Sequence, residues 1–180
     1  GVPAGPGFVL TSSGERIDIS PARTIARMKR YNVGIIGHGW AAAAHIPAIN
    51  ATAHGQVTAI CSSRPLDAAQ VSAQYGSPIK TYTGVDAMLA DKSIHVVSVC
   101  SYPQDHARHA VAAAKAGKHL IIEKPLALKW EDCQAIQEAV GESGVKTCVC
   151  FECRFSSQFL TVKAVIDSGH SIGSIIGGGA

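Results

Sequence analysis

The segment YNVGIIGHGWAA, residues 31–42, decides the fold. A short apolar strand over 33–36 leads through a glycine-rich turn into an alanine-rich helix. In this Gly-x-Gly-x-x-Ala pattern Gly37 permits the tight turn, Gly39 leaves room for a pyrophosphate, and Ala42 lets helix and strand approach closely. The helix start would offer free N–H groups to the phosphates. The segment therefore predicts a dinucleotide-binding turn whose candidate contacts are Gly37, His38, Gly39, Trp40 and Ala41.

Strand and helix patterns alternate along the rest of the chain. Strands are predicted over 33–36, 56–61, 95–100, 119–122 and 145–151, and helices over 40–49, 65–75, 83–90, 103–116, 130–140 and 156–167. Apolar strands separated by helices indicate a parallel sheet covered on both faces. Right-handed crossovers place the carboxyl ends of all strands at one edge, where such sheets bind ligands. The fold class predicted is α/β, a doubly wound Rossmann domain.

Three segments are expected along the chain. Residues 1–27 are rich in Gly, Pro and Ser and are interpreted as a flexible arm or an added extension, because Met28 resembles a natural start. The alternative is an arm that wraps a neighbouring subunit. Residues 28–153 are expected to form the dinucleotide-binding domain, which the strand over 145–151 completes. Residues 154–180 would open a second domain that is largely absent.

Composition excludes several classes of function. The 180 residues carry a net charge of +3, too small to indicate a nucleic-acid partner. No apolar run approaches the roughly 20 residues of a membrane span, and the first residues lack the pattern of a secretory signal. The six cysteines are expected to be reduced, in a cytoplasmic protein. Cys150 and Cys153 form a C-x-x-C without a second ligand pair, so no metal site is predicted.

The end of the second strand bears on the choice of cofactor. A carboxylate there would bind the two ribose hydroxyls of NAD, but no acid occurs before Asp67. Ser62, Ser63 and Arg64 stand there instead, and hydroxyls with a guanidinium suit a 2′-phosphate. NADP is therefore predicted ahead of NAD. The alternative is that Ser62 and Ser63 cap the helix that Pro65 begins.

Glu123-Lys124-Pro125 follows the apolar strand over 119–122. A lysine at the mouth of a buried sheet is costly unless it has a role there. At this edge Lys124 would lie beside the reactive ring of a bound nicotinamide.

Several motifs together resemble the Gfo/Idh/MocA oxidoreductases. They are the glycine-rich turn, His106 after a main strand, Ala116-Gly117-Lys118-His119 leading into Glu123-Lys124-Pro125, and Arg154. The resemblance covers residues 31 to about 175. It implies an N-terminal Rossmann domain followed by a C-terminal α/β substrate domain, here largely absent. It also implies hydride transfer between NAD(P) and sugars, polyols or related carbonyl compounds, and a homo-oligomeric full-length form.

The resemblance assigns expected roles to individual residues. Lys124 would stabilise a developing alkoxide and help to move the proton. Glu123 would lie near the nicotinamide ribose or carboxamide, and Pro125 would follow a cis peptide bond. Ser101 and Tyr102, where proline is shifted from the family pattern, would line the nicotinamide side. His106 would be structural or a cofactor neighbour, and Arg154 would lie near cofactor or substrate or simply be exposed.

Two readings compete with an oxidoreductase. One is a nucleotide-binding sensor or regulator without turnover, and the other is an inactive truncated fragment. The intact Glu123-Lys124-Pro125 motif favours the enzyme.

Overall fold

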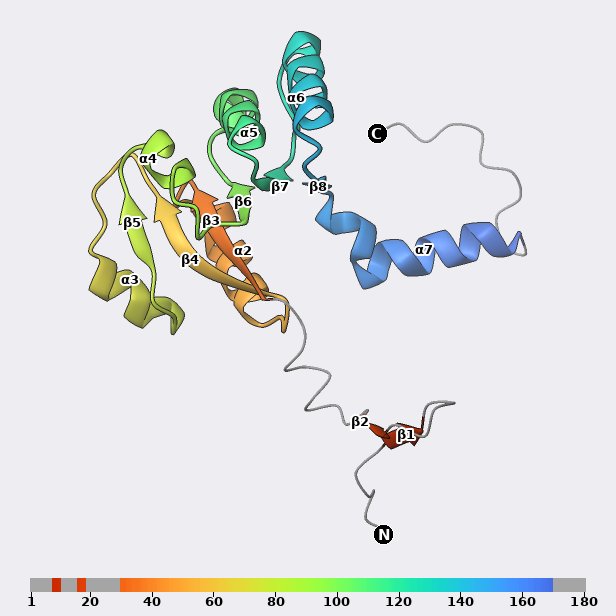
Figure 1. Ribbon diagram of the computed structural model, residues 1–180. Coiled ribbons are helices and arrows are strands. Elements are labelled where there is room, and N and C mark those ends of the chain that lie inside the picture. Colours follow the sequence, from red (N-terminus) through yellow and green to blue (C-terminus); the bar gives the residue numbers. More distant parts are fainter. Residues whose placement is uncertain (1–7, 11–15, 19–29, 170–180) are drawn as a thin grey trace.

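The computed structural model describes residues 8–10, 16–18 and 30–169 (Figure 1). Its centre is a parallel six-stranded sheet in the order β5-β4-β3-β6-β7-β8. The strands are β3 (Tyr31–Ile36), β4 (Gly55–Cys61), β5 (Lys80–Tyr82), β6 (Val96–Val99), β7 (His119–Glu123) and β8 (Thr147–Cys150). The chain moves outward from β3 to β5 and then returns to the other side of β3 with β6. The direction of winding therefore reverses between β3 and β6, the point at which such sheets bind ligands.

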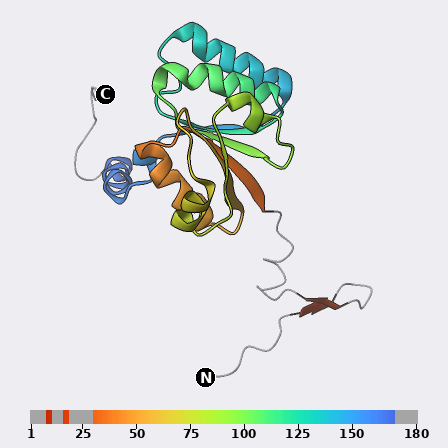
Figure 2. The same cartoon turned by 90° about the vertical axis from the view of Figure 1, so that its left-hand side faces the viewer.

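Helices cover both faces of the sheet (Figure 2). One face carries α2 (Trp40–Asn50) and α3 (Ala68–Tyr75), and the other carries α4 (Val85–Leu89), α5 (His106–Lys115) and α6 (Trp130–Ser143). Successive strand residues point to opposite faces. Ile35 accordingly packs in the cluster that holds Ile46 of α2, whereas Ile36 packs in the cluster that holds Ala110 of α5. The predicted doubly wound α/β class is confirmed.

Two predicted boundaries are wrong for local reasons. The second helix begins at Ala68 rather than Pro65, because the Asp67 side chain accepts hydrogen bonds from the N–H groups of Ala69 and Gln70. Ser62 and Ser63 therefore do not cap it. The helix over 130–143 passes through Gly141 and ends at Gly144, whose φ of +64° suits glycine.

Other differences concern short or peripheral elements. Strand β5 has no counterpart among the strands predicted from the sequence. Within residues 1–27, β1 (Phe8–Leu10) and β2 (Arg16–Asp18) pair antiparallel in a segment for which no regular structure is predicted. The remainder of that predicted arm lies outside the described residues.

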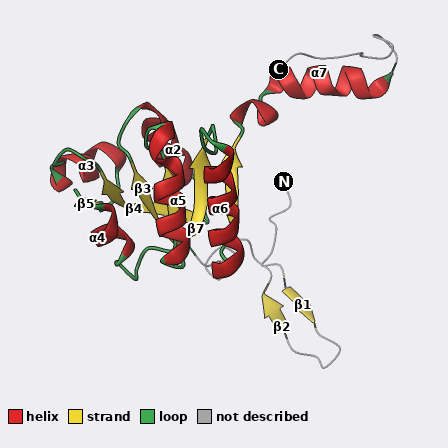
Figure 3. Cartoon of the chain, turned by 90° about the horizontal axis from the view of Figure 1, so that it is seen from above, coloured by secondary structure: helices red, strands yellow, loops and turns green. Residues whose placement is uncertain are grey.

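The last described helix, α7 (Ser157–Ser168), follows a 3₁₀ turn, Glu152–Phe155. It lies apart from the helices that cover the sheet (Figure 3). It exposes Phe159, Leu160 and Val162 to solvent. It occupies the segment in which a second domain is expected to begin, and that domain assignment stays a prediction. Residues 170–180 of that segment lie outside the described residues.

Among the described helices, none has the length and apolar character needed to cross a membrane.

Asp91 ties β5 to the loop that precedes β6. Its carboxylate accepts hydrogen bonds from Lys80 Nζ at 2.8 Å, Tyr82 Oη at 2.9 Å and both the N–H and the hydroxyl of Ser93. The contact with Lys80, followed by those with Ser93 and Tyr82, holds the pKa of Asp91 well below its ordinary value. Because the folded-state pKa is depressed, this stabilisation is present above the unfolded pKa of about 3.9 and is lost as pH falls through the folded value.

Asp91→Asn is expected to lower the free energy of unfolding at pH 7 by roughly 1 kcal/mol, a small value because Lys80 is largely exposed. It should also flatten the loss of stability below about pH 4. Urea unfolding at pH 7 and pH 3 measures both effects. Glu142→Gln, which neutralises an exposed acid on α6, is the control. An Asp91→Asn variant as stable as the wild type at pH 7 would contradict the assignment.

Candidate functional site

The carboxyl ends of the parallel strands bring the predicted site residues to one edge of the sheet. Residues 37–39 follow β3, residues 62–64 follow β4, and residues 101–102 lie just beyond β6. Glu123 is the last residue of β7 and is followed by residues 124 and 125, and residues 151–154 follow β8. A hollow lined by Tyr31, His119 and Lys146 lies at the opposite edge, where the strands begin, and takes no part in this arrangement.

Gly37 fills a position that no other residue fits without strain. Its φ is +94°, and a Cβ built there would lie 2.6 Å from the Cys100 carbonyl oxygen. The Gly37 N–H also donates to the Cys61 carbonyl at 2.9 Å, so the turn is seated between the ends of β4 and β6. The close approach of the Cys100 backbone therefore explains why the turn predicted from the sequence needs glycine at position 37.

Gly39 lies at the N-cap of α2 and faces open space. A Cβ at Gly39 would meet nothing within 4 Å, its φ of −113° is ordinary, and no side chain caps the helix. The first helical N–H groups have no intrahelical partner, and no acid lies in the first turn to neutralise the positive end of the helix. Trp40 beside it is 86% exposed and Ala41 is half-buried. This uncapped end fits a pyrophosphate.

Of the three residues that follow β4, one is buried and two are exposed. Ser62 is buried, and its Oγ accepts a hydrogen bond from the Arg64 N–H at 3.2 Å. Ser63 and Arg64 are exposed. His38 Nε2 lies 3.1 Å from Tyr75 Oη, and burial, together with the charge of Arg64, lowers the His38 pKa. Arg64 is therefore near enough to His38 for its charge to act on the imidazole.

His106 connects two loops of the site rather than facing a ligand. Its side chain is buried, with Nδ1 2.7 Å from the Pro125 carbonyl oxygen and Nε2 3.0 Å from the Ser101 carbonyl oxygen. Ser101 Oγ in turn lies 2.9 Å from His109 Nδ1. Tyr102 is exposed at the edge. Of the two roles expected for His106, this geometry supports the structural one.

Lys124 places an exposed ammonium at the site. The Lys124–Pro125 peptide bond is cis, as the resemblance implied. The side chain is 48% exposed, and its Nζ lies 3.7 Å from an oxygen of Glu152, itself exposed. This long contact leaves the ammonium accessible to a bound molecule. Arg154, in the 3₁₀ turn after β8, is exposed.

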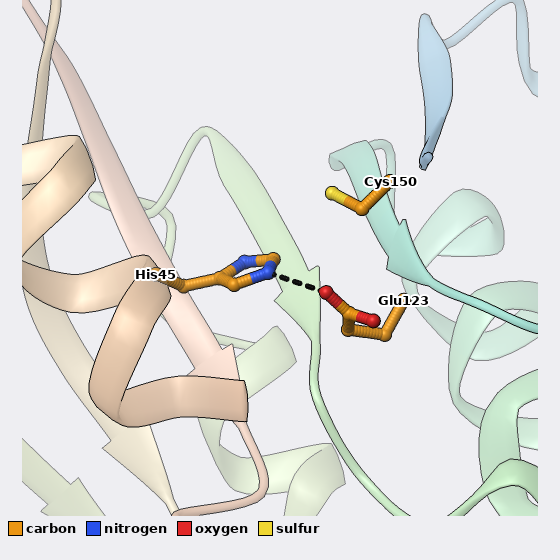
Figure 4. Close-up of side chains that lie close together, drawn as sticks. All are labelled: His45, Glu123 and Cys150. Atoms are coloured by element: carbon orange, nitrogen blue, oxygen red, sulfur yellow. Dashed lines mark hydrogen bonds and ion pairs between the residues drawn. The ribbon is translucent and has the colours of Figure 1, made fainter. Parts of the chain in front are cut away.

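Glu123 is held by a residue that sequence reasoning missed. His45 of α2 places Nε2 2.8 Å from Glu123 Oε1 (Figure 4). His45 Nδ1 lies 2.9 Å from Ser98 Oγ, and the Lys124 N–H donates to Glu123 Oε2 at 3.1 Å. Cys150 lies beside this pair. One sequence feature could have identified His45. It lies three residues after Ala42 in a predicted helix, and this spacing places both residues on the sheet-facing side of α2.

None of the six cysteines is joined in a disulfide bond. Burial raises the pKa of Cys100 to about 12 and, followed by the charge of Glu123, that of Cys150 to about 11. Cys148 is exposed because β8 is an edge strand.

Comparison with known proteins identifies the family. Residues 31–151 match the model of GFO_IDH_MocA, the oxidoreductase family with an NAD-binding Rossmann fold. The chain belongs to this family. Its predicted membership is thereby confirmed.

Curated relatives include two sugar or polyol dehydrogenases. Inositol 2-dehydrogenase of Rhizobium meliloti is 30% identical over 137 residues, 76% of this chain and 41% of the relative. Levoglucosan dehydrogenase of Pseudarthrobacter phenanthrenivorans is 33% identical over 157 residues, 83% of this chain and 40% of the relative. The Gfo/Idh/MocA chain described above thus spans about two fifths of the length of the relatives it matches.

Solved structures share the fold. A 3-ketoreductase from Actinomadura kijaniata, in complex with TDP-benzene and NADP, is 28% identical with a TM-score of 0.74 over 82% of this chain and 45% of that one. A scyllo-inositol dehydrogenase from Lactobacillus casei, with bound NAD(H) and scyllo-inositol, is 25% identical with a TM-score of 0.71 over 78% of this chain and 42% of that one. One of these neighbours binds NADP and the other binds NAD(H), so the comparison does not determine which cofactor this chain prefers.

Proposed function

We propose that the protein is an NADP-dependent oxidoreductase that acts on a sugar, a polyol or a related carbonyl compound. The observation that carries the proposal is the position of Lys124, an exposed cation at the same sheet edge as the open Gly39 turn. Names of relatives, among them inositol and levoglucosan dehydrogenases, support the substrate class.

Each part of the edge would have a distinct task. The uncapped N-terminus of α2 and Gly39 would receive the pyrophosphate. When bound, NADP would supply or accept the hydride at its nicotinamide ring. Lys124 would hold the substrate oxygen, stabilise its developing negative charge and help to transfer its proton. His106 would act indirectly, by fixing the carbonyl of Pro125 and hence the loop that carries Lys124.

NADP is proposed ahead of NAD because the ribose position lacks a carboxylate. Ser63 and Arg64 are exposed there, and the charge of Arg64 helps to lower the pKa of His38. A guanidinium forms charge-assisted hydrogen bonds with phosphate oxygens, whereas the two ribose hydroxyls of NAD would gain little from it.

Arg64→Asp is expected to weaken NADPH binding by about 10–100-fold, because a charge-assisted contact worth roughly 1.5–3 kcal/mol is replaced by repulsion. NADH affinity should not fall, since NADH has no 2′-phosphate and a carboxylate at this position can accept hydrogen bonds from its two ribose hydroxyls. Fluorescence titrations of both dinucleotides measure the two affinities. Lys115→Asp, the same charge change in the last turn of α5, is the control. Equal losses for both dinucleotides would contradict the phosphate assignment.

A further inference from the structure

Three metal-ligating side chains meet on one face of the sheet (Figure 4). His45 Nε2, a carboxylate oxygen of Glu123 and Cys150 Sγ all lie within 4.8 Å of one another. Glu123 and Cys150 are register partners on the parallel strands β7 and β8, so their side chains point to the same face. Helix α2 covers that face and contributes His45. Segments far apart in the sequence thus supply one nitrogen, one oxygen and one sulfur donor.

We propose that His45, Glu123 and Cys150 form a binding site for a thiophilic divalent cation, with Zn²⁺ the preferred ion. The donor set decides the chemistry, because Zn²⁺ binds imidazole, carboxylate and thiolate whereas Mg²⁺ and Ca²⁺ require oxygen ligands. Three protein ligands leave a fourth tetrahedral position for water or another small ligand.

The spacing of the donors is close to what such an ion needs. Ligand bonds of about 2.0–2.3 Å in a tetrahedron separate donor atoms by roughly 3.3–3.8 Å. His45 Nε2 and Glu123 Oε1 are 2.8 Å apart, and no pair within the group exceeds 4.8 Å. Side-chain shifts of about 1 Å would admit the ion. The ion would take the place of the hydrogen in the His45–Glu123 contact and of the thiol hydrogen of Cys150.

Neighbouring groups already orient the ligands as metal sites require. Ser98 Oγ, in a fully buried residue, lies 2.9 Å from His45 Nδ1, and a hydroxyl can accept from Nδ1–H when Nε2 binds the metal. The Lys124 N–H fixes the second oxygen of Glu123 at 3.1 Å. The side chains of His45 and Glu123 are 14% and 16% exposed, so the site is shielded yet open to entry.

The site shares Cys150 with the C-x-x-C of the sequence but not the second thiol of that motif, for which the sequence predicts no metal. Cys148 and Cys153 are exposed and do not belong to the group of three. The inference goes beyond the proposed function, which assigns no task to His45, Glu123 or Cys150.

Metal binding to the intact chain, first freed of metal with a chelator, tests the proposal. Zn²⁺ titrated against a competing fluorescent indicator should occupy one site per chain. Cys150→Ser and His45→Gln should each reduce affinity by at least about 100-fold, since loss of even an outer-shell partner costs 10–100-fold. The double variant Cys148→Ser/Cys153→Ser is the matched control and should bind as the wild type does. Co²⁺ bound to that control should show the absorption band of a cobalt–thiolate bond.

Three results would overturn the proposal: no Zn²⁺ bound at micromolar concentration, unchanged affinity in folded Cys150→Ser, or loss of binding in the folded double variant. Far-UV circular dichroism establishes that each variant is folded. If Cys150→Ser fails to fold, the cobalt band of the control still decides, because its absence excludes Cys150 as a ligand. NADPH titration in the presence of chelator is read separately, so failure of the metal site and failure of the proposed oxidoreductase are distinguishable.

Discussion

Lys124→Met is expected to reduce the rate of hydride transfer by about 10²–10⁴-fold, the range typical of a positioned proton-transfer group. Methionine keeps much of the length of the side chain but removes the ammonium that would stabilise the substrate oxygen. NADPH affinity should stay within about threefold, because the pyrophosphate is assigned to the start of α2 rather than to Lys124. Steady-state rates with polyol or ketose substrates, and a separate NADPH titration, measure the two effects.

The rate measurement belongs to the natural polypeptide that contains this chain, since residues 1–180 span only about two fifths of the relatives. Lys129→Met, at an exposed position five residues later, is the control and should leave the rate unchanged. A Lys124→Met enzyme that retains more than about a third of the wild-type rate would remove Lys124 from the mechanism.

Gly37→Ala is expected to destabilise the fold by about 3 kcal/mol. Part of this cost comes from forcing a residue with a Cβ to a φ of +94°, and part from the contact at 2.6 Å with the Cys100 carbonyl. The contact is with backbone seated between two strands, so relief requires the sheet itself to shift. Urea unfolding followed by circular dichroism measures the loss.

Gly39→Ala, two residues away, is the contrasting substitution. Its Cβ would meet nothing, so stability should change by less than about 1 kcal/mol, the scale of an N-cap preference. NADPH affinity should nevertheless fall at least about tenfold, because the methyl group occupies the space assigned to the pyrophosphate. Similar stabilities for the two variants would contradict the different roles given to these glycines.

Local sequence patterns are sufficient to predict most of the fold. The order of strands and helices follows from apolar runs and turn residues, and the glycine turn is placed correctly because strand, turn and helix are contiguous. Strand β5 escapes prediction because Lys80–Tyr82 is too short and too polar to show a period, and its pairing with β4 is decided by tertiary contact. The sequence predicts a helix start at Pro65, whereas the structure has Asp67 as the N-cap residue. The two are hard to separate because proline and aspartate are both common at helix N-termini.

The candidate site is predictable only where its residues lie at strand ends, as Lys124 and Gly37 do. The contact of His45 with Glu123 joins residues 78 positions apart and depends on how α2 lies over the sheet, which no local pattern reports. His106 is found by resemblance, but its two carbonyl contacts, which make it a connection between loops, appear only in three dimensions.

Binding of NADPH beside the glycine turn is the central claim, and Trp40 provides a direct probe of it. Trp40 is exposed next to Gly39, and replacing the second tryptophan in Trp130→Phe leaves it as the sole tryptophan donor for energy transfer to the reduced nicotinamide. Titration of this variant with NADPH should show saturable, tryptophan-excited nicotinamide emission at micromolar concentration, strongly weakened when Gly39→Ala is added. Emission that never saturates, or that saturates equally with Gly39→Ala, would contradict the account.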